Sequence, residues 1–205
     1  MYSTTSGLIL AFHGCDEKTR DEVIASPTKS VKPSTNVYDW LGHGAYYWEN
    51  DPVRALEWAK FLKEKPPKNT KNIINAPSVL GAVIDLGYCF DLLRRENLSI
   101  LKEFYDNLAK TIEAESLPHN RKIRGSNDAL LRDLDCWAIN EYHKFREKTG
   151  LRPFDSVRGA FWEGNDLYPE AGFKEKSHIQ VCIRNTNCVK GYFIPRIEDL
   201  GFPAV

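Results

Sequence analysis

The stretch that decides the fold is LILAFHG, which occupies residues 8–14. Its first five side chains are apolar, and a short unbroken apolar run is typical of a buried strand. Gly14 permits a turn at the end of this run, because glycine has no Cβ and adopts turn conformations freely. The sequence therefore predicts a buried first strand that stops at Gly14.

Two helix starts lie on either side of a second predicted strand. Asp16 is placed to cap a helix that continues through Ala25. Asp51 followed by Pro52 marks the other start, because aspartate caps helices and proline fits their first turn. Between these helices, residues 44–48 are short and aromatic, which favours a strand. The second helix is expected to turn one apolar face toward the core, formed by Val53, Leu56, Ala59 and Leu62.

The rest of the chain changes from a helical pattern to a strand pattern. An apolar stretch at residues 79–86 predicts a third strand. Apolar residues then recur with the 3.6-residue helical period over residues 98–112 and 130–145. From residue 157 onward the period is two, and strands are expected at residues 157–162, 178–184 and 189–194. This order predicts an α+β fold, and 205 residues fit a single domain over residues 1–205.

The charge of the chain is balanced. Lysine plus arginine equals aspartate plus glutamate, at 28 each, so no overall field attracts nucleic acid or a membrane. Basic residues nevertheless gather in two short clusters: Lys60, Lys63, Lys65, Lys68 and Lys71 in the first, and His119, Arg121, Lys122 and Arg124 in the second. Any basic docking surface must therefore be local.

The cysteine content indicates a reducing compartment. The five cysteines include no Cys-x-x-Cys pair, which argues against a disulfide framework and against a metal site. The N-terminal residues contain no signal peptide and no membrane span. We expect a soluble, cytoplasmic protein that does not contact a membrane.

The usual nucleotide-binding and hydrolase fingerprints are missing from the sequence. No Gly-rich phosphate loop lies between a strand and a helix, and neither H-E-x-x-H nor G-x-S-x-G occurs. Three other segments combine histidine, glycine, aromatic and polar residues: Phe12-His13-Gly14, GHGAYYWE at residues 42–49, and SHIQVCI at residues 177–183. A dinucleotide would have to be held by segments of this kind.

These three segments, in this order, resemble the three marks of the diphtheria-toxin and poly(ADP-ribose)-polymerase branch of the ADP-ribosyltransferases. Those marks are His-Gly-x, Gly-x-Tyr-Phe and a late strand led by glutamate. The resemblance covers three short motifs spread over most of the chain. It implies a split β-sheet core with an NAD cleft and a central helical segment. It also implies an enzyme that uses NAD as a co-substrate and moves ADP-ribose onto a macromolecular acceptor.

The resemblance assigns cofactor-binding roles to the first two motifs. His13 would bond a ribose hydroxyl of NAD, and the backbone of Gly14 would pair with the nicotinamide amide, since a ligand approaches a backbone closely where no Cβ intervenes. Tyr46 would stack on the cationic nicotinamide ring. Alternation turns Tyr47 toward the core, although a shift of one residue exchanges the two tyrosines. The polymerase branch often has a second ring further on, where Trp58 is available. Core packing is the alternative for each side chain.

Gln180 departs from the family pattern. Alternation places Gln180 on the polar face of its strand, where the resemblance expects the catalytic glutamate. Glutamine offers a hydrogen bond to ribose without the charge that stabilises an oxocarbenium-like transition state. The resemblance makes His13, Tyr46 and Gln180 the catalytic set, and implies transfer of single units because chain growth goes with the glutamate. Carboxylates of the preceding loop are candidates for the missing charge: Glu163, Asp166, Glu170 and Glu175.

That loop, at residues 163–176, stands where the family carries its acceptor-reading loop. Three aromatic side chains lie on it or next to it: Trp162, Tyr168 and Phe173. They would either stack on an acceptor base or pack the loop onto the domain.

Three functions are compatible with these residues. The first is an NAD-dependent mono-ADP-ribosyltransferase acting on protein, RNA or DNA, which would suit the toxin of a toxin–antitoxin or phage-defence system with an antitoxin as partner. The second is a module that binds NAD or ADP-ribose with little or no catalysis, which Gln180 favours. The third is an NAD-dependent RNA 2′-phosphotransferase, for which no arginine set is placed by motif to grip the phosphate.

Overall fold

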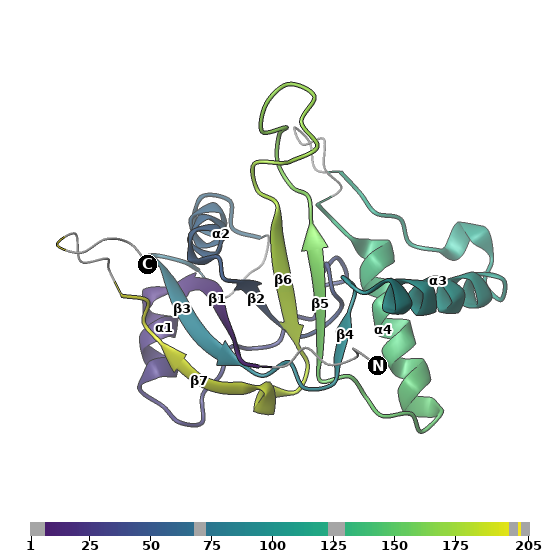
Figure 1. The fold of residues 1–205 in the computed structure, drawn as a ribbon, viewed down its shortest axis with the longest axis horizontal. Coiled ribbons are helices and arrows are strands. Elements are labelled where there is room, and N and C mark those ends of the chain that lie inside the picture. The colour runs from purple at the N-terminus through teal and green to yellow at the C-terminus, as the bar shows by residue number, and fades with distance from the viewer. Residues whose placement is uncertain (1–6, 68–72, 123–129, 197–200, 202–205) are drawn as a thin grey trace.

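A computed structural model describes residues 7–67, 73–122, 130–196 and 201. Within these residues the strands form a seven-stranded sheet in the order β4-β5-β6-β2-β1-β3-β7 (Figure 1). Neighbouring strands are antiparallel except β4 and β5, which are parallel. The strands are β1 (Ile9–Asp16), β2 (Ala45–Glu49), β3 (Pro77–Ile84), β4 (Cys89–Asp91), β5 (Ser156–Phe161), β6 (His178–Ile183) and β7 (Val189–Phe193).

The predicted α+β class is confirmed. The helices in the described residues are α1 (Glu17–Ile24), α2 (Pro52–Glu64), α3 (Arg95–Ala109) and α4 (Asp133–Lys148), with short 3-10 turns η1 (Ala114–Ser116) and η2 (Thr186–Cys188). Two predicted caps are also confirmed. The side chain of Asp16 accepts a hydrogen bond from the N–H of Lys18, and that of Asp51 accepts one from the N–H of Arg54. In the described part of the chain, no helix combines the length and apolar character needed to cross a membrane.

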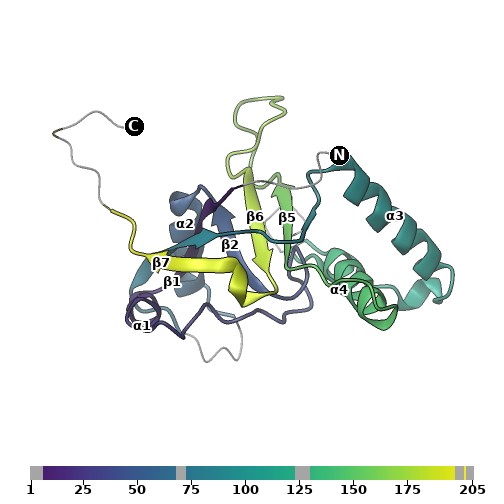
Figure 2. The ribbon, with the colours of Figure 1, turned by 60° about the horizontal axis from the view of Figure 1, so that its bottom comes forward.

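The shortest ladder in the described sheet joins β1 to β2. β1 pairs with β3 at eight positions, whereas its ladder with β2 consists of Ala11↔Glu49 and Phe12↔Trp48. After Phe12, β1 leaves β2 and continues alongside β3. In Figure 2, β3 and β7 run across the direction of β2, β6 and β5. The sheet therefore opens at its centre, between β1 and β2.

Helices cover both faces of the sheet. On one face, Val23 of α1 packs in a cluster that contains Tyr47. On the other face, Ala55 of α2 packs against Trp48. Ile139 of α4 belongs to a second cluster on that same face, over β5 and β6. Each face of β2 therefore has a different helix above it, and its side chains alternate between two environments.

Two expectations from the sequence are wrong, and the packing of α2 explains both. β1 does not stop at Gly14 but continues to Asp16. On α2, Ala55 and Ala59 are buried, whereas Val53 is 67% exposed. A Cβ on Gly14 would lie 2.0 Å from the carbonyl oxygen of Ala55, so α2 crosses β1 at a backbone-to-backbone distance. The small residues Gly14, Ala55 and Ala59 allow this close contact between α2 and β1, whereas the larger Val53 points to solvent.

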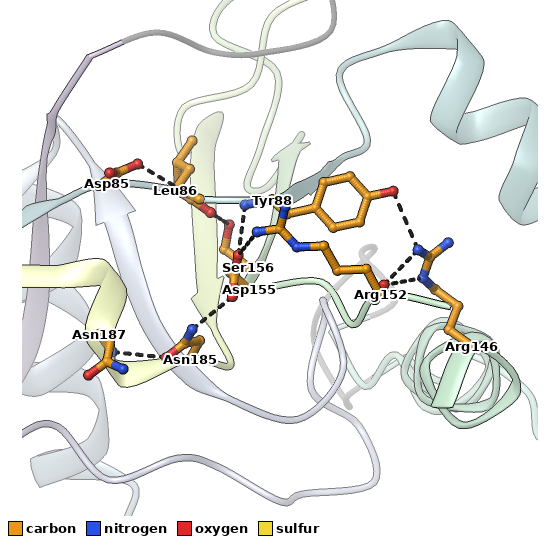
Figure 3. A network of polar contacts seen from close by, with 10 residues as sticks. Asp85, Leu86, Tyr88, Arg146, Arg152, Asp155, Ser156, Asn185 and Asn187 are labelled. Atoms are coloured by element: carbon orange, nitrogen blue, oxygen red, sulfur yellow. Dashed lines mark hydrogen bonds and ion pairs between the residues drawn. The ribbon is translucent and has the colours of Figure 1, made fainter. Parts of the chain in front are cut away.

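A polar network ties the start of β5 and the end of β6 to the turn after β3 (Figure 3). The carboxylate of Asp155 accepts hydrogen bonds from the N–H of Tyr88 at 2.8 Å and from the Asn185 side chain at 2.8 Å. Arg152 also donates to it at 3.2 Å. Arg146 of α4 donates to the carbonyl of Arg152 at 2.6 Å. The network joins α4 to the sheet through bonded polar groups.

Candidate functional site

The three motifs lie on adjacent strands. His13 is on β1, Tyr46 on β2 and Gln180 on β6, and the sheet order places β2 between the other two. The ladder pairs Trp48 of β2 with Gln180 of β6, and pairs the same Trp48 with Phe12 of β1. Residues that are far apart in the sequence, Trp48 and Gln180, therefore meet at the centre of the sheet, where it opens.

His13 forms a contact across this opening. Its ring Nδ1 lies 2.8 Å from the backbone carbonyl oxygen of Tyr46. A carbonyl only accepts, so Nδ1 carries the proton and Nε2 of the neutral ring is an acceptor. Burial lowers the pKa of His13, although the bond to the Tyr46 carbonyl opposes this shift, and the neutral ring is therefore the form at neutral pH. The ring lies 5.8 Å from that of Tyr47, centroid to centroid.

The backbone of Gly14 faces the same opening. The carbonyl of Leu10 accepts a hydrogen bond from the N–H of Asn50, which follows β2, so Leu10 points its backbone groups toward β2. Backbone groups alternate along an antiparallel strand, and Gly14, four residues later, points its N–H and C=O the same way. The ladder between β1 and β2 ends before it, at Phe12. Gly14 thus directs a donor and an acceptor past the last strand pair.

The glycine itself is required for a different reason from the one expected. Its missing side chain makes room for the Ala55 carbonyl of α2, not for a ligand on that face. A ligand that pairs with the Gly14 backbone must therefore lie between β1 and β2, in the plane of the sheet.

The two tyrosines of the second motif have different surroundings. The hydroxyl of Tyr46 donates to the carbonyl of Gly42 at 2.6 Å and accepts from the N–H of Leu41 at 2.8 Å. These bonds hold the ring against the preceding turn. Tyr47 is 1% exposed, and its hydroxyl lies 3.1 Å from that of Tyr192. Burial raises the pKa of both hydroxyls. Tyr47 is in the core, as alternation predicts, and presents no free ring face to a ligand.

Gln180 lies on the face that Tyr46 and Trp48 share, because cross-strand partners point to the same side. His13 and Tyr47 alternate to the other face. Gln180 is 8% exposed, and no hydrogen bond joins its side chain to another of the described residues. A buried amide without partners among the residues that the structure describes is available to a ligand.

Among the four loop carboxylates, Glu163 is next to this site. Its two oxygens accept hydrogen bonds from Arg54 at 2.8 and 2.7 Å, and both side chains are largely buried. Asp166 is paired instead with Lys174, and Glu175 with Asn165. Glu170 is exposed on the loop. Glu163 therefore brings a carboxylate to the site, and Arg54 offsets most of its charge.

Sequence reasoning did not identify Arg54, His178 and Trp48 as members of the site. The guanidinium of Arg54 lies 5.8 Å from the Trp48 ring centroid, and the His178 ring lies 6.3 Å from that of Trp48. His178 Nδ1 is 3.9 Å from Glu163. Two signals were present: an arginine on the first turn of an apolar helix, and a histidine on the same strand face as Gln180. Neither signal indicates that Arg54 and His178 both lie beside Glu163.

The remaining predicted rings are partly exposed. Trp58 is 36% exposed, and its ring lies 6.2 Å from that of Trp48. Trp162, Tyr168 and Phe173 are each more than half exposed. The loop that carries the last two is a short hairpin with a bridge between Asp166 and Lys174, so these rings are not packed onto the body of the protein.

Both basic clusters extend beyond the described residues, which leave out Lys68, Lys71 and Arg124. In the second cluster, Arg121 is paired with Asp133. Two surface hollows lie away from the candidate site. One of about 690 Å³ lies beside α1 and β7, and one of about 420 Å³ lies between α3 and α4. Neither is lined by a motif residue.

Comparison with known proteins finds a distant similarity. The chain is 27% identical over 195 residues to an uncharacterized protein from Methanocaldococcus jannaschii, in an alignment that covers 87% of this chain and 83% of that protein. No family model matches the chain, and no solved structure matches it.

Proposed function

We propose that this protein is an NAD-dependent mono-ADP-ribosyltransferase with a His-Tyr-Gln site. The observation that carries the proposal is the meeting of the three motif strands, with His13 bound to the Tyr46 carbonyl where β1 and β2 separate. The narrow junction between β1 and β2 supports a split sheet of the kind that the sequence resemblance implies.

The opening between β1 and β2 suits a carboxamide. A primary amide offers one acceptor and two donors, and Gly14 directs one N–H and one C=O into the opening. The nicotinamide of NAD would be held there by two backbone bonds, with the ring of Tyr46 on the neighbouring strand as its stacking partner. Nε2 of His13, an acceptor in the neutral ring, would take a bond from a ribose hydroxyl.

The reaction would break the bond between the nicotinamide nitrogen and C1′ of the ribose. Nicotinamide leaves with the bonding electron pair, a nucleophile of the acceptor bonds to C1′, and that nucleophile loses its proton. Gln180 and His13 lie on opposite faces of the sheet, so both would reach one ribose only where it passes through the opening between β1 and β2. Gln180 would bond a ribose hydroxyl there without adding charge. The absent charge costs on the order of 2–4 kcal/mol of transition-state stabilisation, by analogy with a deleted oxyanion-hole donor. Slow transfer of single units is the expected result.

The uncharged Gln180 also supports a second candidate, a module that binds NAD or ADP-ribose without turnover. Glu163 does not remove this alternative, because Arg54 offsets its charge. The class of acceptor, protein or nucleic acid, and an antitoxin partner in the cytoplasm remain parts of the proposal that rest on the resemblance.

The test uses NAD labelled in its adenylate phosphate, incubated separately with cell protein, RNA and DNA. Wild type should label one of these pools, and Tyr46→Ala should abolish labelling. Gln180→Glu should raise NAD turnover about 10²-fold, since it restores the charge. The control is Leu98→Ala, which changes a half-exposed side chain on α3 that has no part in the site. NAD binding without transfer or hydrolysis in wild type and in Gln180→Glu would favour the binding module.

A further inference from the structure

The hairpin between β5 and β6, at residues 162–177, carries large apolar side chains that face solvent. Figure 1 shows it projecting beyond the end of β5 and the start of β6. Its exposed apolar side chains are Trp162, Leu167, Tyr168 and Phe173, and each is 57–64% exposed. Proteins rarely gather so many large apolar side chains in one exposed region, and such patches mark interaction sites. The hairpin is therefore a candidate docking surface.

Backbone hydrogen bonds fix the shape of this hairpin. The N–H of Leu167 donates to the carbonyl of Phe173 at 3.0 Å. These two residues therefore lie opposite each other, and their side chains point to the same face. Asp166 and Lys174, the neighbouring pair, alternate to the other face and form an ion pair there. The hairpin thus has one apolar face and one charged face.

The tip of the hairpin holds a carboxylate in an unfavourable backbone conformation. The N–H of Ala171 donates to the carbonyl of Tyr168 at 2.9 Å, which closes a turn with Pro169 and Glu170 at its centre. Glu170 has a φ of 63°. A positive φ at this position of a turn favours glycine, and other residues adopt it at a cost that is typical of functional sites. Glu170 is exposed and has no ion pair with another of the described residues, so its carboxylate is available to a partner.

The charges of the hairpin indicate the class of partner. Residues 164–177 carry three carboxylates and two lysines, and one of these lysines, Lys174, is paired with Asp166. At the base of the hairpin, Arg54 is bound to Glu163. Nucleic acid binds where an excess of basic side chains meets the phosphates, and this surface offers none. An apolar face beside an unpaired carboxylate suits a protein surface that combines apolar and basic side chains.

We propose that this hairpin docks the acceptor of ADP-ribose, and that the acceptor is a protein with an apolar site flanked by lysine or arginine. The inference rests on the proposed function, which places the ribose next to Gln180. The hairpin leads directly into β6, so an acceptor held on it lies at the end of the strand that carries Gln180. Leu167 and Phe173 supply the apolar contact, and Glu170 supplies the charged one.

The test uses NAD labelled in its adenylate phosphate, with cell protein, RNA and DNA in separate reactions. Wild type should label protein and neither nucleic acid. Leu167→Ser removes part of the apolar contact, and it should raise the protein concentration for half-maximal labelling about tenfold. The labelling rate at saturating protein should stay at the wild-type value, because the substitution leaves the NAD site intact. Leu98→Ser on α3, which changes a side chain that is 49% exposed, is the matched control and should behave as wild type.

Substitutions of Glu170 separate its charge from its backbone conformation. Glu170→Gly relieves the positive φ, and the midpoint of thermal unfolding should rise by about 2–4 °C. It also removes the carboxylate, and the half-maximal protein concentration should rise about threefold. Glu170→Gln should raise that concentration equally without the gain in stability. The Kd for NAD, measured by calorimetry, should match wild type in every variant.

Labelling of RNA or DNA in place of protein overturns the inference and leaves the proposed function standing. Protein labelling with wild-type half-maximal concentrations in both Leu167→Ser and Glu170→Gln also overturns it, since the hairpin would then make no contact with the acceptor. A wild type that binds NAD and labels none of the three pools overturns the inference together with the transferase, and favours the binding module.

Discussion

The two ends of the β5–β6 pair carry polar clusters of opposite kinds. At one end, Asp155 and Arg146 belong to a network whose bonds link the turn after β3, α4 and the sheet (Figure 3). At the other end, Glu163 and His178 lie beside nitrogen atoms that have no partner among the described residues. A satisfied buried network stabilises a fold, whereas unsatisfied groups cost stability and are retained where they meet a ligand. This contrast is the reason to propose a structural role for the first end and a ligand-binding role for the second.

The largest expected effect comes from breaking the satisfied end. Asp155→Ala removes three acceptor bonds and leaves the N–H of Tyr88 and the side chain of Asn185 unpaired. We expect the free energy of unfolding in urea to fall by about 3 kcal/mol, at about 1 kcal/mol for each bond. Asp155→Asn keeps an acceptor oxygen and should lose less. NAD turnover per folded molecule should not change. A loss of NAD turnover without a loss of stability would contradict a purely structural role for Asp155.

A third buried group tests whether an unpaired nitrogen alone indicates chemistry. His143 on α4 also has an Nε2 without a partner among the described residues, and its ring packs 5.8 Å from that of Phe154. Burial, together with Arg184 and Arg146, lowers the pKa of His143 from 6.5 to about 3. The unfolded chain therefore takes up this proton below pH 6.5 while the folded chain does not. Its contribution to stability is complete above pH 6.5 and declines toward pH 3.

Between pH 7 and pH 4.5 this group should cost about 2–3 kcal/mol of unfolding free energy. Urea unfolding of His143→Leu at the two pH values should show a pH dependence smaller by that amount. Phe145→Leu, a substitution without a titratable group on the same helix, is the control and should keep the wild-type dependence. An unchanged slope in His143→Leu would mean that folding does not lower the pKa of this histidine.

The unsatisfied end should respond in the opposite way from Asp155. His178→Phe replaces an unpaired nitrogen by ring carbons among the rings of Trp40 and Phe161, and it also removes the hydrogen bond from Nδ1 to the Lys176 carbonyl. We expect stability to stay within about 1 kcal/mol of wild type or to rise, while NAD turnover falls. Thermal unfolding and nicotinamide release on the same samples make the comparison. A loss of stability as large as that of Asp155→Ala would place His178 in the structural class.

The smallest effect concerns the edge of the site. Trp58→Ala removes a ring that lies beside Trp48, and partial exposure limits its contribution. We expect the Kd for NAD to rise about two- to fivefold, as loss of about 0.5–1 kcal/mol of ring contact implies. Trp162→Ala, measured by the same calorimetry, should leave the Kd unchanged. Equal effects of the two substitutions would exclude a specific role for Trp58.

Local rules explain the parts of the fold that could be predicted. Period-two and 3.6-residue patterns located the strands and the helices, and Asp16 and Asp51 cap α1 and α2 because capping needs only neighbouring residues. Alternation also placed Tyr47 in the core. The errors at Gly14 and Val53 arose from one contact that the pattern cannot contain, the close crossing of α2 over β1.

The sequence by itself determined the elements, their caps, the alternation of each strand and the three motifs that suggest NAD. Tertiary structure alone decided that β1 and β2 separate after Phe12, that Arg54 pairs with Glu163 across 109 positions, and that His178 is sealed beside Gln180. The physical reason is range. Capping and periodicity act over a few residues, whereas ion pairing and burial depend on which distant surfaces meet.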